Sequence, residues 1–235
     1  MNMSNSANAT LVKRMKSDKL IGEFSMWSAN LLRLEDDMSR IATHADMLHV
    51  DVADGHFAPA MLFFPDLVSA MKKKASLPIH VHLMTADNIL LSQIDQFAEA
   101  GADLISVHLE NRNLDEALAR IASLGKAAGI VLKYDTPVAG IAPYLGRISF
   151  LTLLGTAIGV KGQSLSPTAC PRLIEANNII AKAGKSETII LAADGGIREN
   201  TVPELRKAGA ETVVLGSLAF GATDLAIRIK WLKSI

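Results

Sequence analysis

The stretch that decides the fold covers nine residues and reads His49-Val50-Asp51-Val52-Ala53-Asp54-Gly55-His56-Phe57. It ends an apolar run with ionisable residues at alternate positions, and alternate side chains of a strand project from the same face. His49 and Asp51 therefore point into one space, while Asp54 and Gly55 are turn residues that end the strand. The pattern predicts a buried strand that carries its reactive groups at its carboxyl end.

Two further runs repeat this arrangement. His80 and His82 alternate within one apolar run, and the run from 188 to 196 ends with Asp194 and two glycines. A single strand histidine is more often a hydrogen-bonded core residue, but four such groups would cost several kcal/mol if buried without partners. Imidazoles and carboxylates together suit a divalent ion, with Zn²⁺, Fe²⁺, Mn²⁺ and Co²⁺ as candidates. The predicted ligands are His49, Asp51, His82 and Asp194.

Strands and helices alternate along the chain after its first twenty residues, with about eight of each. The predicted strands cover 22–27, 47–51, 78–84, 104–108, 129–133, 148–154, 188–193 and 212–215. The predicted helices cover 31–42, 65–75, 87–100, 114–124, 137–145, 170–183, 198–207 and 218–232. The strands are continuous apolar runs, which indicates a parallel sheet covered on both faces.

A closed barrel explains this pattern better than an open doubly wound sheet. No G-x-G-x-x-G phosphate turn follows the first strand, where the sequence reads Ser28-Ala29-Asn30. In a closed barrel all strands end at one mouth, where the ionisable residues would meet. We therefore predict a (β/α)8 TIM barrel, as one domain, over residues 21–235. Residues 1–20 are polar and lack an apolar signal-peptide segment, so we expect a loosely ordered extension there, with Leu11-Val12 and Leu20-Ile21 as its packing points.

The composition favours a small-molecule partner. The 24 Lys and Arg residues balance 24 Asp and Glu residues, which gives no basic surface for nucleic acid or an anionic membrane. No apolar stretch approaches the roughly 20 residues of a membrane span. The single cysteine, Cys170, excludes an internal disulfide and fits a reducing compartment, so we expect a cytoplasmic protein.

Glycines gather after the last three predicted strands. One glycine could simply end a turn, but exposed N–H groups at consecutive strand ends are a common way for barrels to bind phosphate. Ser25 ends the first strand without a nucleophile-elbow sequence, so we expect it to hydrogen-bond a substrate oxygen. We also count His82 among the substrate contacts. The remaining predicted contacts are Gly159, Val160, Lys161, Gly162, Gly195, Gly196, Gly216 and Ser217.

Four other ionisable residues near these strand ends are weaker candidates. His80 shares a face with His82 but lies one layer deeper, which favours a structural role or one of orienting a ligand. His56 and His108 face the predicted mouth, and Glu110 could equally be a solvated loop residue.

These motifs, in this order, resemble the ribulose-phosphate 3-epimerase family, including its allulose-6-phosphate epimerase-like members. The resemblance covers about residues 24–221 and includes the segments 49–57, 80–84, 100–103, 194–197 and 216–217. It implies a (β/α)8 barrel that inverts the carbon next to the carbonyl of a ketose phosphate. It also implies that His49, Asp51, His82 and Asp194 bind a metal ion, and that the two aspartates transfer the proton.

The same resemblance implies further roles and a weak expectation of homo-oligomers. Ser25 matches the family's substrate-contacting serine, and the three glycine clusters match its phosphate loops. Ala53 and Leu154 stand where the family usually has methionine. Ala60 and Lys133 replace usual asparagines, and Lys161 adds a cation beside a phosphate loop. The resemblance keeps ribulose 5-phosphate and xylulose 5-phosphate among the candidate substrates, while these departures favour a related pentose, hexose or tetrose phosphate.

Two alternatives remain open at this stage. The altered pocket could belong to a non-catalytic barrel that only binds a sugar phosphate. A phosphate-binding barrel decarboxylase or synthase would be expected to carry a lysine two residues after the metal-binding aspartate. Ala53 occupies that position after Asp51, which counts against this second alternative.

Overall fold

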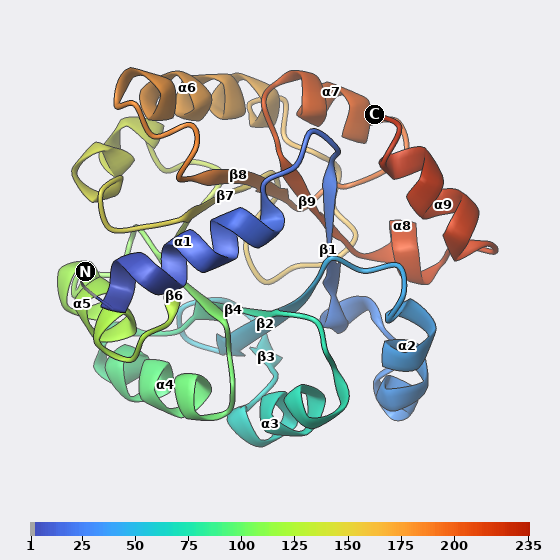
Figure 1. The fold of residues 1–235 in the computed structure, drawn as a ribbon, viewed down its shortest axis with the longest axis horizontal. Coiled ribbons are helices and arrows are strands. Elements are labelled where there is room, and N and C mark those ends of the chain that lie inside the picture. Colours follow the sequence, from blue (N-terminus) through green and yellow to red (C-terminus); the bar gives the residue numbers. More distant parts are fainter. Residues whose placement is uncertain (1–2) are drawn as a thin grey trace.

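The structure is a computed structural model that describes residues 3–235, and its centre is a closed barrel (Figure 1). Each parallel strand pairs with the next one around the ring, and β1 pairs with both β2 and β9, which closes the sheet. The fold prediction of a (β/α)8 barrel is therefore confirmed. The barrel strands are β1 (Ile21–Ser25), β2 (Met47–Asp54), β4 (Ile79–Met84), β5 (Leu104–His108), β6 (Ala127–Leu132), β7 (Phe150–Leu154), β8 (Ile190–Asp194) and β9 (Thr212–Leu215).

Helices surround the strands and cover the outside of the barrel (Figure 1). Apolar side chains from the strands and from the inner faces of these helices form one continuous core. The helices are α2 (Leu34–Ile41), α3 (Pro65–Lys74), α4 (Asp87–Glu99), α5 (Leu114–Ser123), α6 (Ala169–Lys182), α7 (Val202–Lys207), α8 (Ser217–Phe220) and α9 (Leu225–Leu232). None of the helices in residues 3–235 is long and apolar enough to cross a bilayer.

Several elements differ from the sequence-based expectation. The predicted last helix is two helices, because Gly221 ends α8 and the side chain of Asp224 accepts a 3.0 Å hydrogen bond from the N–H of Ile227 at the start of α9. The segment η3 (Val138–Tyr144) is a 3₁₀ helix and contains Pro143, whose nitrogen cannot donate to an α-helical ladder. A short strand, β3 (Met61–Leu62), pairs antiparallel with the end of β2. Two more 3₁₀ turns, η1 (Met26–Ser28) and η2 (Leu31–Arg33), follow β1.

The amino-terminal end of the barrel is closed by α1 (Met3–Met15), which crosses it in Figure 1. We expected a loose extension here and no helix, so the helix itself was not predicted. The packing points that we did expect, Leu11-Val12 and Leu20-Ile21, are buried. Leu11, Val12 and Met15 are buried and pack in one apolar cluster with side chains from the starts of the barrel strands. A helix this polar gains little from its own sequence, so the apolar end of the barrel is what makes it stable.

The carboxyl end of the barrel is where the strand register gathers polar side chains. Ser25 of β1 lies beside His49 of β2, and Asp51 of β2 lies beside His82 of β4. Because side chains alternate along a strand, all four belong to the faces that point into the barrel. The register therefore places them together at the mouth.

Candidate active site

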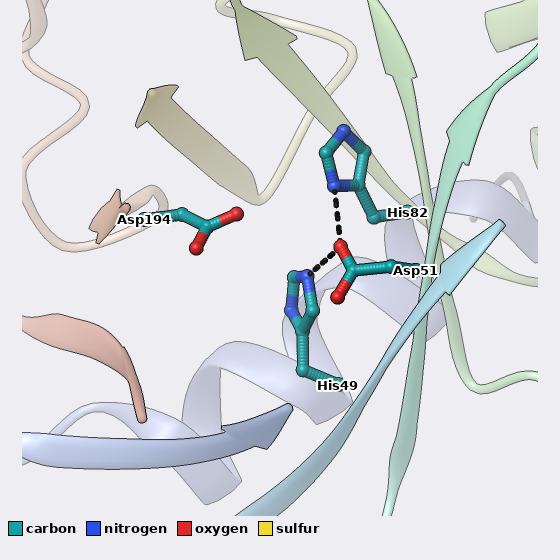
Figure 2. A group of neighbouring side chains, drawn as sticks. All are labelled: His49, Asp51, His82 and Asp194. Carbon is teal, nitrogen blue, oxygen red and sulfur yellow. Dashed lines mark hydrogen bonds and ion pairs between the residues drawn. The ribbon is translucent and has the colours of Figure 1, made fainter. Parts of the chain in front are cut away.

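The four predicted metal ligands converge at the mouth of the barrel (Figure 2). One ligand atom from each of His49, Asp51, His82 and Asp194 lies within 4.8 Å of the others. Asp51 is central, because its Oδ1 is 3.2 Å from His49 Nε2 and 3.2 Å from His82 Nδ1. Asp194 reaches in from β8 on the opposite side, and no dashed bond joins it to the other three side chains in Figure 2.

The surroundings of the two aspartates push their pKa values apart. Burial disfavours the charged form of Asp51, but the adjacent His49 and His82 outweigh it and hold the pKa of Asp51 well below its usual range. Burial raises the pKa of Asp194 to about 6, and the negative charges of Asp51 and Glu23 add to that shift. Asp51 is therefore ionised over the whole physiological range, whereas Asp194 takes up a proton at a pH only slightly below neutral.

This donor set fits a divalent metal ion. It offers two imidazole nitrogens and two carboxylate oxygens, a combination suited to zinc and to other divalent first-row metals. His49 and His82 are almost completely buried, at 0% and 1% exposure, whereas Asp51 retains 6%. Three carboxylates in or against this buried space, those of Asp51, Asp194 and Glu23, would be compensated by a cation at its centre.

Glu23 is a buried carboxylate that the sequence analysis missed. Its Oε2 lies 2.9 Å from His49 Nδ1 and 2.6 Å from His80 Nδ1, and Ser106 lies 2.7 Å from the other nitrogen of His80. The two histidines outweigh the effect of burial and lower the pKa of Glu23 to about 2. The alternation of side chains along the first strand could have identified it, because Glu23 lies two residues before Ser25 and therefore on the same face of this apolar strand.

A second chain of hydrogen bonds lies behind His82. His82 Nε2 is 2.8 Å from His108 Nε2, and His108 Nδ1 is 2.9 Å from Glu110 Oε2. The backbone N–H of Lys133 and the hydroxyl of Thr136 donate to the other oxygen of Glu110. Glu110 is therefore an anchored hydrogen-bond partner of the network rather than a free loop carboxylate.

A cavity of about 860 Å³ opens above the four-residue cluster. Of the residues predicted to act in the site, all except His49 line its wall. His49 lies beneath the floor, with no exposed surface. The predicted residues on the wall are Ser25, Asp51, His82, Gly159, Val160, Lys161, Gly162, Asp194, Gly195, Gly196, Gly216 and Ser217.

Two of these glycines are required by the shape of the loop after β8. Gly195 and Gly196 have φ angles of +87° and +70°, a region that other residues rarely adopt. A Cβ atom would lie 2.3 Å from Thr156 Oγ1 at position 195 and 2.7 Å from the Cα of Leu165 at position 196. Only glycine fits at these two positions. The loop therefore presents backbone atoms, and no side chain, to the cavity here.

Lys161, in the loop after β7, and Ser25, at the end of β1, both contribute polar atoms to the cavity. The Lys161 ammonium lies 4.6 Å from the centre of the Trp27 ring and donates to the Trp27 carbonyl. Partial burial lowers the pKa of Lys161. The Ser25 hydroxyl donates a 3.0 Å hydrogen bond to Asp51 Oδ2, the oxygen that does not face the histidines.

The residues that depart from the family pattern fall in different places. Leu154 lines the cavity, whereas Ala53 does not and packs against Ala58 and Met84. The Lys133 ammonium lies 4.1 Å from the centre of the Phe57 ring. His56 is exposed and does not line the cavity, so it has no place in the site.

The fold and the site together define a barrel enzyme with a carboxylate and imidazole cluster below a glycine-lined cavity. The sequence model of the ribulose-phosphate 3-epimerase family matches residues 22–220. The chain belongs to this family, and therefore to the isomerases.

Curated relatives agree with this assignment. The chain is 36% identical to "Ribulose-phosphate 3-epimerase" of Aquifex aeolicus over 202 residues, covering 86% of this chain and 89% of the relative. It is 32% identical over 227 residues to "Ribulose-5-phosphate-3-epimerase, chloroplastic" of Arabidopsis thaliana, covering 95% and 79%. The alignments extend over nearly the whole barrel in each case.

Solved structures resemble the fold at low sequence identity. The crystal structure of KGPDC from Streptococcus mutans superposes with a TM-score of 0.68 at 12% identity, covering 92% of this chain and 97% of that one. Orotidine 5'-phosphate decarboxylase from Pyrococcus horikoshii gives a TM-score of 0.65 at 14% identity, covering 91% and 98%. At these identities the likeness supports the barrel fold alone.

Proposed function

We propose that the chain is a metal-dependent epimerase that inverts C3 of a ketose phosphate. The observation that carries the proposal is the approach of Asp51 and Asp194 from different strands to one point on the cavity floor, beside two buried imidazoles. The family membership supports the same reaction. Inversion of a carbon next to a carbonyl needs two proton-transfer groups, and these two aspartates are placed to be that pair.

The proposed transfer uses the two aspartates on opposite sides of C3. Asp51 accepts the proton from C3, and the protonated form of Asp194, which burial makes more accessible, delivers its proton to the opposite face of the planar intermediate. Epimerisation in the reverse direction exchanges their roles. The hydroxyl of Ser25, which is bonded to Asp51 Oδ2, is close enough to orient that carboxylate or a substrate oxygen.

His49, Asp51, His82 and Asp194 would hold the divalent ion, with Zn²⁺ as our first choice and Fe²⁺, Mn²⁺ and Co²⁺ as alternatives. When bound, the ion supplies positive charge that stabilises the enediolate left by removal of the C3 proton.

The substrate phosphate would bind where the three glycine loops meet. The backbone of Gly195 and Gly196 is open to the cavity, and the turn at Gly216 and Ser217 lies on the same wall. Lys161, in the loop that contains Gly159 and Gly162, adds a cation nearby. These groups hold one end of the sugar, so that C3 lies over the aspartates.

Isotope exchange tests the reaction directly. Incubation of the wild-type protein with a ketose phosphate in heavy water is expected to place deuterium at C3, detected by NMR. Asp194→Asn should abolish epimerisation and leave the fold unchanged by circular dichroism. Normal turnover in that variant would overturn the two-aspartate mechanism.

The sugar is a separate part of the proposal. Leu154 lines the cavity where the family usually has methionine, and Lys161 adds a cation, so we propose a pentose, hexose or tetrose phosphate other than ribulose 5-phosphate. A panel of ketose phosphates should give a higher kcat/KM for one of these sugars. A clear preference for D-ribulose 5-phosphate would contradict this choice of substrate and leave the reaction type intact.

Metal analysis separates the enzyme from a barrel that only binds a sugar phosphate. About one tightly bound divalent ion per chain favours the epimerase, while binding of sugar phosphate without metal or isotope exchange favours the alternative. The homo-oligomeric state and the cytoplasmic location stay predictions.

A further inference from the structure

Glu23 stands out among the ionisable residues that the proposed reaction does not use. It lies in β1, has no exposed surface, and is surrounded by three polar side chains. His49 and His80 each approach its Oε2 through Nδ1, at 2.9 and 2.6 Å, and the Thr212 hydroxyl lies 3.3 Å from its Oε1. Nothing in the reaction requires a carboxylate below the cavity floor.

The hydrogen bonds around Glu23 allow one consistent arrangement of protons. An ionised carboxylate only accepts, so His49 and His80 both donate from Nδ1. The hydroxyl of Ser106 then donates to His80 Nε2, 2.7 Å away. His49 Nε2 lies 3.2 Å from Asp51 Oδ1 and donates to that carboxylate when no ion is bound. A bound ion would take the place of this proton, so that Nε2 would present its lone pair to the ion while Nδ1–H stays on Glu23.

A metal ion between Glu23, His49 and His80 is the competing interpretation, because these three residues also lie within reach of one cation. Their spacing argues against it. Ligand atoms that share a tetrahedral ion at about 2.0–2.1 Å lie roughly 3.3 Å apart. The separations of 2.9 and 2.6 Å are those of charge-assisted hydrogen bonds.

His82, the second imidazole of the cluster, is also linked to a carboxylate, through one intervening side chain. His82 points Nδ1 at Asp51 and Nε2 at His108, which is bonded in turn to Glu110. Each predicted imidazole ligand is therefore hydrogen-bonded to a carboxylate on the side away from the ion. The bond is direct for His49 and Glu23, and it passes through His108 for His82 and Glu110. A carboxylate behind a ligating imidazole fixes its tautomer and makes it a better electron donor.

We propose that Glu23 is a positioning residue for the metal centre: it holds His49 in the Nδ1–H tautomer, with Nε2 directed at the ion, and His80 and Ser106 hold Glu23 in place. The inference rests on the proposed metal site. It assigns His80 a role through Glu23 and not through the metal, since His80 Nδ1 faces Glu23 and its Nε2 faces Ser106.

The test compares the metal affinity of the folded wild-type protein with that of Glu23→Gln. Zn²⁺ dissociation constants come from competition with a chromophoric chelator, and the Co²⁺ form reports ligand geometry through its visible absorption. Loss of such a supporting carboxylate typically weakens metal affinity about 10–100-fold. We expect a change in this range, a shifted Co²⁺ spectrum, and ¹⁵N NMR signals that show His49 no longer fixed as the Nδ1–H tautomer.

Two control variants exclude a general loss of stability, and a third variant gives a graded effect. Thr212→Val removes only the 3.3 Å contact to Glu23, and Leu104→Ala loosens the apolar cluster at the amino end of the barrel. Both should keep the wild-type Zn²⁺ affinity within about twofold, although the second lowers the melting temperature. Ser106→Ala should have an intermediate effect of a few-fold, because it acts on His49 only through His80 and Glu23.

The outcomes are distinguishable. A wild-type protein that binds no divalent ion overturns both the proposed function and this inference. Wild-type binding with unchanged affinity and an unchanged His49 tautomer in a folded Glu23→Gln variant overturns the inference alone. Two ions per wild-type chain, with one lost in Glu23→Gln, would make Glu23 a ligand and also overturn it.

Discussion

The two ends of the barrel are built from opposite kinds of side chain. At the amino-terminal end, α1 covers the strand starts with Leu11, Val12 and Met15, and this cluster is apolar. At the carboxyl end, the strands present buried carboxylates and imidazoles below an open cavity. One end stabilises the barrel by removing apolar surface from water, while the other concentrates buried carboxylates whose negative charge a bound cation would balance.

Removal of a central charge should have the largest effect at the carboxyl end. Asp51→Asn is expected to lower kcat by about 10³-fold and to release the metal ion, because Asp51 contacts both imidazoles and is the proposed base. Isotope exchange and metal analysis measure the two effects. Asp115→Asn, at a 75% exposed side chain of α5, is the control and should keep full activity. If Asp51→Asn kept its metal ion and its turnover, the proposed role of the carboxyl end as the reactive end of the barrel would be wrong.

A substitution that leaves a cavity in the apolar cluster at the amino end should lower the stability of the protein without lowering its activity. Leu11→Ala removes a side chain that is 6% exposed, and deletions of this kind cost about 2–4 kcal/mol in the free energy of unfolding. Urea denaturation measures the loss, and kcat at 25 °C is expected to stay within about twofold of wild type. Leu32→Ala, at a side chain that is 97% exposed, should change stability by under about 0.5 kcal/mol. A large fall in kcat for Leu11→Ala would show that the two ends are coupled.

Loss of the Lys161 ammonium at the mouth should weaken substrate binding and leave the rate of the chemical step unchanged. Lys161→Gln is expected to raise KM about tenfold, equivalent to about 1.4 kcal/mol, with kcat nearly unchanged. Steady-state kinetics with the preferred ketose phosphate tests this. The exposed Lys230 of α9 offers a matched Lys→Gln control, for which KM should not change. If kcat falls and KM does not, Lys161 acts on the reacting atoms.

The smallest expected effect is a pH trend confined to the carboxyl end in metal-free protein. The pKa of Asp194 is about 6 in the folded chain against 3.8 for the ordinary group, so its stabilising contribution is complete below about pH 3.8 and is lost as the pH rises through 6. The free energy of unfolding of Asp194→Asn, relative to that of wild type, should therefore increase as the pH is raised from 5 to 7.5. Urea unfolding with a chelator present measures both proteins. The stability change caused by Leu11→Ala should be the same at both pH values. An Asp194→Asn difference that does not vary with pH would contradict the raised pKa.

Several parts of the fold could be predicted because they depend on short-range pattern. The strands Leu104–His108 and Thr212–Leu215 have the predicted bounds, since each is an apolar run preceded by a glycine at a helix end. The split between α8 and α9 was missed because the apolar spacing continues across Gly221, and only the cap by Asp224 shows where the second helix begins. The helix α1 was missed because its buried side is small and its partner surface lies far away in the sequence.

The sequence alone determined which residues could act and on which face of each strand they lie. The alternation of His49 with Asp51 and of His80 with His82, the carboxylate at Asp194, and the glycines after the last strands were sufficient for this, because strand geometry fixes the direction of each side chain. Closure of the barrel decided the rest. It brought Asp194 to Asp51, placed Glu23 behind His49, and linked His82 through His108 to Glu110. Such contacts depend on the register between strands that are distant in the chain, which no local pattern specifies.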